Sequence, residues 1–301
     1  MLKKCFMLFF TLSFLMANDI TPIPLKVTDI NPQKATLGKK LFFDTILSKN
    51  NTVACVNCHI LSDGGDDNRQ FSIGINNQSG NINSPTVLNS RYNFVQFWNG
   101  RAKDLQEQAA SPIENPVEMG NNFPNLIKTL KKSSYKKEFD AIYKNGITKE
   151  NITDAIAEYE KTLITPNAPF DKYLRGDKNA ITKIQKEGYE LFKSKGCISC
   201  HNGINIGGNL YAKFGVFKEA KSKSLGRYEV THNKLDKYFF KVPTLRNISL
   251  TAPYLYDGRY TKLSDMVKFM ISYQLGKKAK QDDINKIIAF LISLTGKLPK
   301  Q

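Results

Sequence analysis

Histidine and tryptophan are scarce in this chain of 301 residues, which holds three histidines and a single tryptophan. Long apolar runs are missing as well, because the most apolar stretch, residues 5–16, is shorter than the roughly 20 residues that a membrane-spanning helix needs. Segments that alternate apolar and polar residues, as half-buried strands do, are few. The sequence therefore predicts a mainly α fold without stable membrane insertion.

The first 17 residues have the layout of a secretory signal peptide. Lys3 and Lys4 precede the apolar stretch, and the small residue Ala17 follows it. We expect cleavage near Ala17 and export to the periplasm. The alternative is a retained membrane anchor, which the shortness of the apolar stretch disfavours.

Acidic residues are outnumbered, since 44 Lys and Arg against 27 Asp and Glu give a formal net charge of +17. Such a charge suits an acidic protein partner or an anionic membrane surface. Nucleic acid is not expected as a partner of an exported protein. Many of the lysines are scattered along the chain, and a solvated surface explains these equally well.

Proline, glycine and polar clusters divide the chain into helical and irregular segments. Asn151 is the expected N-cap of one helix, because apolar residues follow it at helical spacing. Pro166 and Pro169 interrupt this pattern and mark a domain junction. We therefore expect a first domain at 18–165 and a second at 166–301, with the last helix able to pack back on the first domain. The other expected segments are an extended arm at 18–33, helices at 35–47, 179–195, 263–275 and 281–295, a long loop at 62–85 and an irregular region at 203–243.

A weak internal repeat supports two domains. Gly38, Leu41 and Phe42 precede one pair of cysteines, and the segment from Gly188 to Phe192 repeats this pattern before a second pair. Each segment is predicted as a helix that carries glycine and an aromatic residue on one face and leads into the cysteines.

Two Cys-x-x-Cys-His motifs are the strongest chemical signal. In such a motif two thiols add to the vinyl groups of a haem and the adjacent histidine binds the iron. A zinc site is disfavoured because the two pairs are too far apart for a zinc ribbon, and a redox disulfide does not explain a histidine after both pairs. We therefore predict two covalently bound c-type haems, attached through Cys55, Cys58 and His59 and through Cys197, Cys200 and His201.

Histidine is too scarce to supply the second axial ligand of both haem irons. Only His232 remains after the two motifs, and it lies in a lysine-rich stretch. Met266 and Met270, four residues apart on one predicted helix, are the candidate sulfur ligands, although a methionine is also a common core residue. The number of available histidines therefore predicts one haem iron with methionine as its second axial ligand and one haem iron that is open to a small oxygen species.

The chain resembles the bacterial di-haem cytochrome c peroxidases over nearly its whole length after the signal. The resemblance implies two cytochrome c-like domains packed face to face, with peroxide reduced at the N-terminal haem and electrons received at the C-terminal haem. The matching segments are LGKKLFFD (37–44), NSPTVLNS (83–90), QFWNGRAKDLQEQA (96–109), PVEMG (116–120), FKVPTLRN (240–247) and LTAPYLYDG (250–258).

The resemblance also assigns roles to single residues. It implies Glu118 as the distal acid and base, Gln108 as its partner in the peroxide pocket, and Trp98 between the haems. Met270 falls at the axial position of the C-terminal haem. Asn83, with the carbonyls of Thr251 and Pro253, matches a calcium site at the domain interface. The family is often dimeric, so a homodimer is also expected by analogy.

Two positions depart from the family pattern. Ile75 replaces a loop histidine that often caps the peroxidatic haem, and Tyr256 replaces a second family histidine. Because isoleucine cannot bind iron, we hypothesise that the N-terminal haem is open even when both irons are oxidised.

The expected activity is reduction of hydrogen peroxide to water with electrons from a small redox protein such as a cytochrome c. Two alternatives stay open: an electron carrier or peroxide sensor without turnover, and an enzyme that oxidises a partner protein. Met270 argues against the second, because the family's protein-oxidising relative has tyrosine at that position.

Overall fold

The computed structural model describes residues 20–300, so the expected signal peptide lies outside the described residues. Helices dominate these residues and strands are few, which confirms the mainly α fold. Within 20–300 no helix is long and apolar enough to cross a bilayer.

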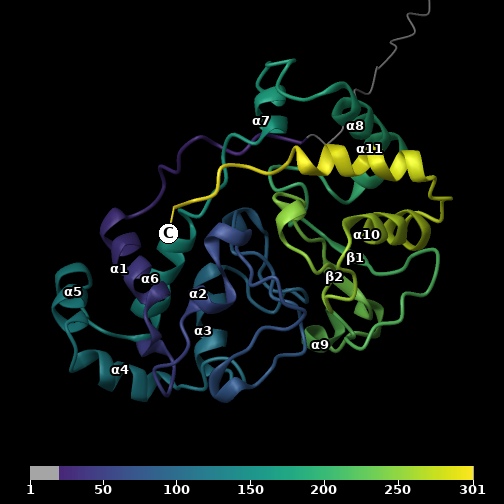
Figure 1. The fold of residues 1–301 in the computed structure, drawn as a ribbon. Helices are drawn as coiled ribbons and strands as arrows, with labels where there is room; N and C mark the ends of the chain where they lie inside the picture. Colours follow the sequence, from purple (N-terminus) through teal and green to yellow (C-terminus); the bar gives the residue numbers. More distant parts are fainter. Residues whose placement is uncertain (1–19, 301) are drawn as a thin grey trace, which may run out of the picture.

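The N-terminal half is built from helices joined by long loops (Figure 1). An extended arm leads into the first helix at Pro32, and a separate 3-10 turn at Thr45–Leu47 follows after Asp44, whose extended backbone ends the helix. The helices are α1 (Pro32–Phe43), α2 (Cys55–Cys58), α3 (Leu105–Glu114), α4 (Phe123–Lys131), α5 (Tyr135–Ile142) and α6 (Lys149–Glu160).

The C-terminal half adds a small two-stranded sheet to its helices. The strands β1 (Tyr211–Lys213) and β2 (Phe239–Lys241) pair antiparallel, with Tyr211 opposite Lys241. A π-helical turn, Met270–Gln274, continues α10. The helices are α7 (Pro169–Leu174), α8 (Lys183–Lys195), α9 (Tyr228–Thr231), α10 (Leu263–Phe269) and α11 (Gln281–Ile292).

The expected repeat corresponds to two equivalent helix pairs. Helix α1 packs on α6, and α8 packs on α11. A Cβ on Gly38 would lie 1.7 Å from the Ala155 carbonyl oxygen, and one on Gly188 would lie 1.9 Å from the Lys286 carbonyl oxygen. Each pair therefore approaches closely only because glycine stands at the crossing.

The structure reveals a further repeat that joins the halves. Residues 83–89 (NSPTVLN) correspond to 241–247 (KVPTLRN), and 97–101 (FWNGR) correspond to 255–259 (LYDGR). The Asn83 N–H donates to the Tyr256 carbonyl, and the Lys241 N–H donates to the Trp98 carbonyl, both at 2.8 Å. The halves thus meet through two equivalent hydrogen bonds.

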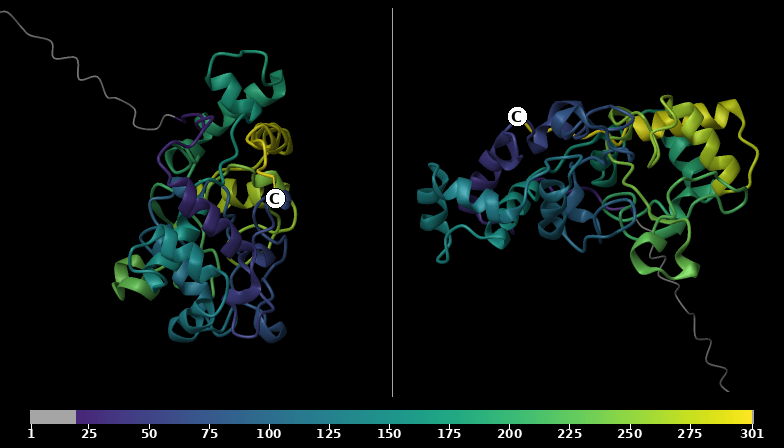
Figure 2. Two further views of the ribbon diagram at one scale, coloured as in Figure 1. Left: turned by 90° about the vertical axis from the view of Figure 1, so that its left-hand side faces the viewer. Right: turned by 90° about the horizontal axis from the view of Figure 1, so that it is seen from below.

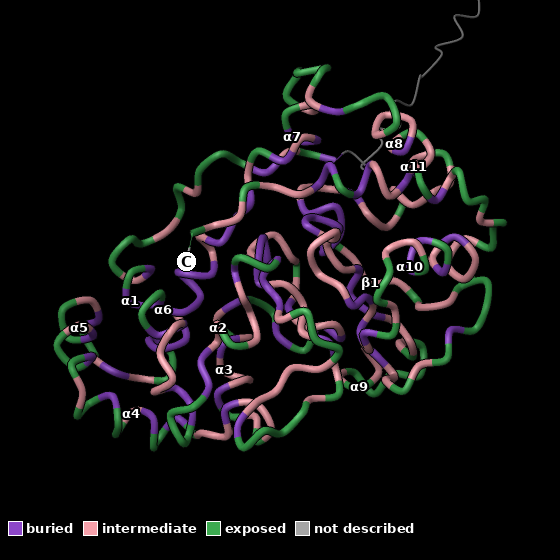
Figure 3. Tube along the Cα trace, in the orientation of Figure 1, coloured by how far each residue is buried: buried purple, intermediate pink, exposed green. Residues whose placement is uncertain are grey.

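The apolar core falls into separate clusters in the two halves, which lie side by side along the long axis of the molecule (Figure 2). Buried segments gather inside each half, and exposed residues follow the outer turns (Figure 3). One cluster draws on residues 37–156, and another mainly on 170–294 with Ile20 from the arm. We propose the domain division near residue 165 on this basis.

Two local expectations need correction. The N-cap of α6 is Thr148, whose Oγ1 accepts from the Asn151 N–H, so Asn151 lies inside the helix. Thr148 was overlooked because the apolar repeat begins only after Asn151. Helix α11 packs on α8 in its own half, and the tail after it returns to the first half, where Leu298 packs beside Phe42.

Candidate active site

Both Cys-x-x-Cys-His motifs form a short helical turn. The first motif is α2, and the second is the 3-10 turn Cys197–Ser199, which follows Gly196 in the left-handed conformation that ends α8 (φ 97°). All four thiols of the described residues are free of disulfides and line cavities. They are therefore available for thioether bonds to a haem.

The two motif histidines are held in the same way. His59 Nδ1 donates to the Gly65 carbonyl at 3.1 Å, and His201 Nδ1 donates to the Ile206 carbonyl at 3.3 Å. Burial lowers the pKa of both imidazoles, that of His201 to about 4. A neutral ring that donates from Nδ1 presents Nε2 as a metal ligand, so these residues fit two haems.

The cavity beside His59, called here the N-terminal cavity, is the larger one and contains about 1580 Å³ of space not filled by atoms. Glu118 and Gln108 line it together with His59, Cys55 and Cys58. The predicted acid Glu118, its partner Gln108 and the motif histidine His59 therefore line one cavity, although the acid and the histidine are about 60 residues apart in the sequence. Arg101, which the sequence reasoning missed, lines the same wall.

Glu118 lies in the turn that follows α3, and its Oε1 accepts from Asn115 Nδ2 at 2.5 Å. Burial raises the pKa of its carboxyl group, while the Arg101 guanidinium and the Asn115 amide act in the opposite direction. The carboxyl group is therefore a proton acceptor that is stronger than a solvated glutamate, held in place by one amide.

The loop that carries Ile75 closes against Glu118. The Ile75 N–H donates to the Glu118 carbonyl at 2.7 Å, and the Ile75 side chain is 3% exposed and packs in the apolar core with Met119. No histidine other than His59 lines the N-terminal cavity among the described residues, and His232 is exposed. Met119 also lines this cavity, so it is the sulfur that a spectroscopic test must exclude.

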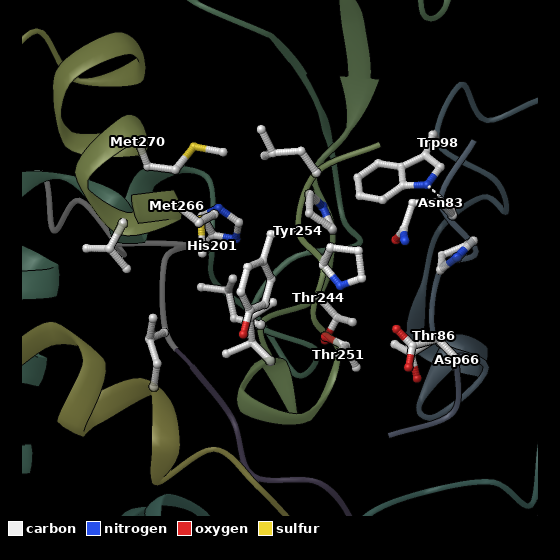
Figure 4. A pocket seen from close by; sticks show the side chains of 18 of the residues that line it. Asp66, Asn83, Thr86, Trp98, His201, Thr244, Thr251, Tyr254, Met266 and Met270 are labelled. Atoms are coloured by element: carbon white, nitrogen blue, oxygen red, sulfur yellow. Dashed lines mark hydrogen bonds between the residues drawn. The ribbon is translucent and has the colours of Figure 1, made fainter. Parts of the chain in front are cut away.

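The cavity beside His201, called here the C-terminal cavity, is lined by both candidate methionines (Figure 4). Met266 is 6% exposed and belongs to the apolar core, whereas Met270 is partly buried at its edge. Met270 begins the π-helical turn and also lines a third cavity that contains Cys197 and Cys200. A π turn is a frequent mark of a functional position in a helix.

Trp98 lines all three cavities, so it lies between the two motif histidines. Its Nε1 donates to the Asn83 carbonyl at 2.9 Å (Figure 4). Tyr256, at the equivalent position of the repeat, lines the N-terminal and third cavities and stacks on Phe240 with ring centroids 5.0 Å apart. Two aromatic residues thus lie at the boundary between the N-terminal cavity and the cavities beside His201.

The residues expected to bind calcium meet on one side of the C-terminal cavity, where Thr251, Pro253 and Asn83 all lie. Asn83 Nδ2 donates to the carbonyls of Arg69 and Gln70, which leaves its Oδ1 for a ligand. Asp66 lies on the same wall (Figure 4). Its Oδ1 is buried without a hydrogen-bond partner among the described residues.

Burial, together with the nearby Asp67, raises the pKa of Asp66 to about 7. An orphaned buried carboxylate beside carbonyl and amide oxygens fits a hard cation such as Ca²⁺. Asp66 was missed in the sequence because it stands in the polar loop 62–85, where acidic residues are numerous. Lys241, which also lines the C-terminal cavity, was missed as well. Comparison of the repeated segments would have drawn attention to it, because it occupies the position that corresponds to Asn83.

Two c-type haem sites with a shared aromatic boundary define a di-haem cytochrome. A sequence model of the family described as "Di-haem cytochrome c peroxidase" matches residues 32–179. The chain is 48% identical to cytochrome c551 peroxidase of Nitrosomonas europaea, covering 97% of this chain and 89% of the relative. It is 44% identical to cytochrome c551 peroxidase of Pseudomonas aeruginosa, covering 93% and 85%.

The fold is that of a solved "MauG-like protein associated with microbial copper homeostasis", with a TM-score of 0.81 and 22% identity over 94% of this chain and 95% of that one. The chain belongs to the di-haem cytochrome c peroxidase family. It is an oxidoreductase with two haem cofactors, a peroxide substrate and a cytochrome electron donor. These relationships favour a catalytically active peroxidase and give less support to the electron-carrier and protein-oxidising alternatives.

Proposed function

We propose that this protein reduces hydrogen peroxide in the N-terminal cavity and takes up electrons at the C-terminal haem. The observation that carries the proposal is the meeting of Glu118 and Gln108 with His59 in one cavity from which every other histidine of the described chain is absent. When bound, the two haems supply the iron at which peroxide is held and reduced and a second store for one electron.

The side chains that line the N-terminal cavity transfer the proton and orient the peroxide. Glu118 takes the proton from the peroxide oxygen nearer the iron and returns it to the other oxygen, so that the leaving group is water and not hydroxide. Gln108 orients the peroxide by hydrogen bonding. Two electrons and two protons convert each hydrogen peroxide into two waters. Arg101 keeps the Glu118 carboxylate available by favouring its charged form.

Glu118→Gln is expected to lower the rate of peroxide turnover about 10²- to 10⁴-fold, because the amide cannot accept and return the proton. The measurement is the steady-state oxidation of a reduced donor by peroxide. Glu114→Gln is the matched control, since Glu114 lies four residues away and forms only an exposed ion pair with Lys149. An undiminished rate in Glu118→Gln would remove this residue from the mechanism.

We also propose that the two irons are coordinated unequally before any reduction. Support comes from the burial of Ile75 in the apolar core, which leaves the loop without a ligand to offer, and from the place of Met270 beside His201. The N-terminal iron would then be high-spin and open in the oxidised protein, and the C-terminal iron low-spin with His201 and Met270 as ligands.

The electron paramagnetic resonance spectrum of the oxidised protein should accordingly contain one high-spin and one low-spin haem. Met270→Leu should convert the low-spin component to high-spin, whereas the matched variant Met266→Leu should retain it. The proposal fails if both haems are low-spin in the oxidised wild type, and the assignment of Met270 fails if Met266→Leu alone loses the component. A Met119→Leu variant shows whether that sulfur contributes.

We propose a calcium ion at Asn83 and the carbonyls of Thr251 and Pro253, with Asp66 adding a charge nearby. Calorimetric titration of chelator-treated protein with Ca²⁺ should give saturable binding, and Asp66→Asn should weaken it about tenfold because the ligand charge sets the affinity. Asp63→Asn, three residues away and exposed, is the control. A heat of binding that does not saturate as Ca²⁺ is added would contradict the proposed calcium site.

For the donor we propose a docking face beside the third cavity. Val216 and Phe217 are 54% and 66% exposed, and the Phe217 N–H donates to the Tyr273 carbonyl at 2.9 Å, next to Met270 and Gln274, which line that cavity. Exposed lysines flank this apolar pair in the sequence at positions 213, 218, 221 and 223, with one exposed acid, Glu219, and two more follow Gly276, which contacts Phe217, at positions 277 and 278. An apolar centre with a basic rim fits a small cytochrome whose own docking face is acidic.

The rate of reduction by an acidic cytochrome should fall as ionic strength rises, because salt screens the lysine rim. Lys218→Glu should slow this reduction at low salt by about tenfold or more, whereas Lys128→Glu, on exposed α4 in the other half, should not. A rate that ignores both salt and Lys218→Glu would place the donor elsewhere.

We further propose export to the periplasm. The proposal is supported by the signal-peptide pattern of residues 1–17. N-terminal sequencing of the protein from a periplasmic extract should begin near Asn18. An uncleaved N-terminus in a membrane fraction would contradict the proposal.

A further inference from the structure

Lys241 is a buried cation at the boundary between the haem sites. It ends β2, and its side chain lines the C-terminal cavity and the third cavity, both of which contain His201 and Met270. Only 4% of its surface is exposed. Its N–H donates to the Trp98 carbonyl, so its backbone is fixed against the aromatic residue that separates the haems.

The structure gives the Lys241 ammonium group no hydrogen-bond or ion-pair partner within residues 20–300, and its nitrogen is not among the fully enclosed polar atoms, so the group is open to the cavities that the residue lines. Arg246, another buried cation, shows the usual arrangement: it pairs with Asp171 at 2.6 Å and donates to the carbonyls of Ile204 and Thr21. A buried charge without a partner is strongly unfavourable. Burial alone lowers the pKa of Lys241 to about 8, since no carboxylate lies close enough to oppose it.

The counter-charge is therefore expected from a group bound in these cavities, because no carboxylate of the described residues contributes at Lys241. A haem carries two propionate carboxylates, and a haem attached at Cys197 and Cys200 occupies the cavities that Lys241 lines. Lys241 does not line the N-terminal cavity. The anion is thus expected from the C-terminal haem and not from the N-terminal one.

We propose that Lys241 is a positioning residue that pairs with a propionate of the C-terminal haem and raises the reduction potential of that haem. The inference rests on the proposed attachment of this haem to Cys197 and Cys200, and it goes beyond the proposed function by naming what sets the potential of the electron-accepting site. A fixed positive charge beside a haem disfavours the oxidised iron, which carries one more positive charge than the reduced iron.

Lys241 also links this electrostatic effect to the electron path. Because its backbone holds Trp98 and its side chain faces the C-terminal haem cavities, one residue orders both the propionate and the aromatic boundary. The equivalent residue of the other half is Asn83, an uncharged amide, so only one of the two equivalent positions carries a charged side chain.

Spectroelectrochemical titration of the fully haem-loaded protein tests the proposal. Lys241→Met, which keeps length and removes charge, should lower the potential of the C-terminal haem and leave that of the N-terminal haem nearly unchanged. Lys241→Arg should stay close to the wild type. Lys234→Met is the matched control, because it removes an exposed lysine seven residues upstream in the same half.

A second readout probes the propionate directly and does not depend on the measured potential. In resonance Raman spectra the propionate bending band of the C-terminal haem should shift between wild type and Lys241→Gln and be retained in Lys241→Arg. The proposal is overturned if Lys241→Met and Lys234→Met give equal potentials, if the N-terminal potential falls instead, or if the Raman band is the same in all variants. Wild-type peroxide turnover is measured alongside, since its absence would count against the proposed function and not against this pairing.

Discussion

Two backbone hydrogen bonds hold the halves in register, and the site depends on them. The Asn83 N–H donates to the Tyr256 carbonyl, and the Lys241 N–H donates to the Trp98 carbonyl. Each bond joins the start of one Pro-Thr segment to the aromatic residue of the opposite half. Because these donors and acceptors are buried together, slippage of one half against the other would leave them unpaired at a cost of about 1–3 kcal/mol each.

The same Pro-Thr segments also contact the backbone carbonyls that hold the two motif histidines. The Gly65 carbonyl that accepts from His59 also accepts from the Val87 N–H, and the Ile206 carbonyl that accepts from His201 also accepts from the Leu245 N–H. The repeat therefore ties each motif histidine, its Pro-Thr segment and the interface into one network. What differs between the halves is the opposite wall: a loop supplies the Glu118 carboxylate in one cavity, and α10 and the π-helical turn supply Met266 and Met270 in the other.

The sequence predicted the features that rest on short-range patterns. The Cys-x-x-Cys-His spacing, the placement of Gly38 and Gly188 on one face of their helices, and the helix that ends before Gly196 needed only local rules. Long-range facts needed either the family resemblance or the structure. Nothing local to Glu118 shows that it faces His59, and the exposed or buried state of Lys241 depends on the pairing of β1 with β2. Thr148 was missed as a cap for a local reason, since a threonine at the true N-cap competes with an asparagine three residues later.

The loop with Ile75 shows how one substitution changes what a segment can do. A side chain buried in an apolar cluster anchors its backbone, and burying an isoleucine contributes about 1.5–3 kcal/mol. The backbone next to it pairs with Glu118, and a Cβ on Gly74 would lie 2.1 Å from the Val117 carbonyl oxygen, so the loop and the Glu118 turn are in direct contact. Moving the loop would cost that burial and release the turn that carries the acid. The apolar anchor therefore supports the proposed open peroxide pocket, because Ile75 holds the loop in place and offers no ligand, whereas a histidine at this position could bind iron.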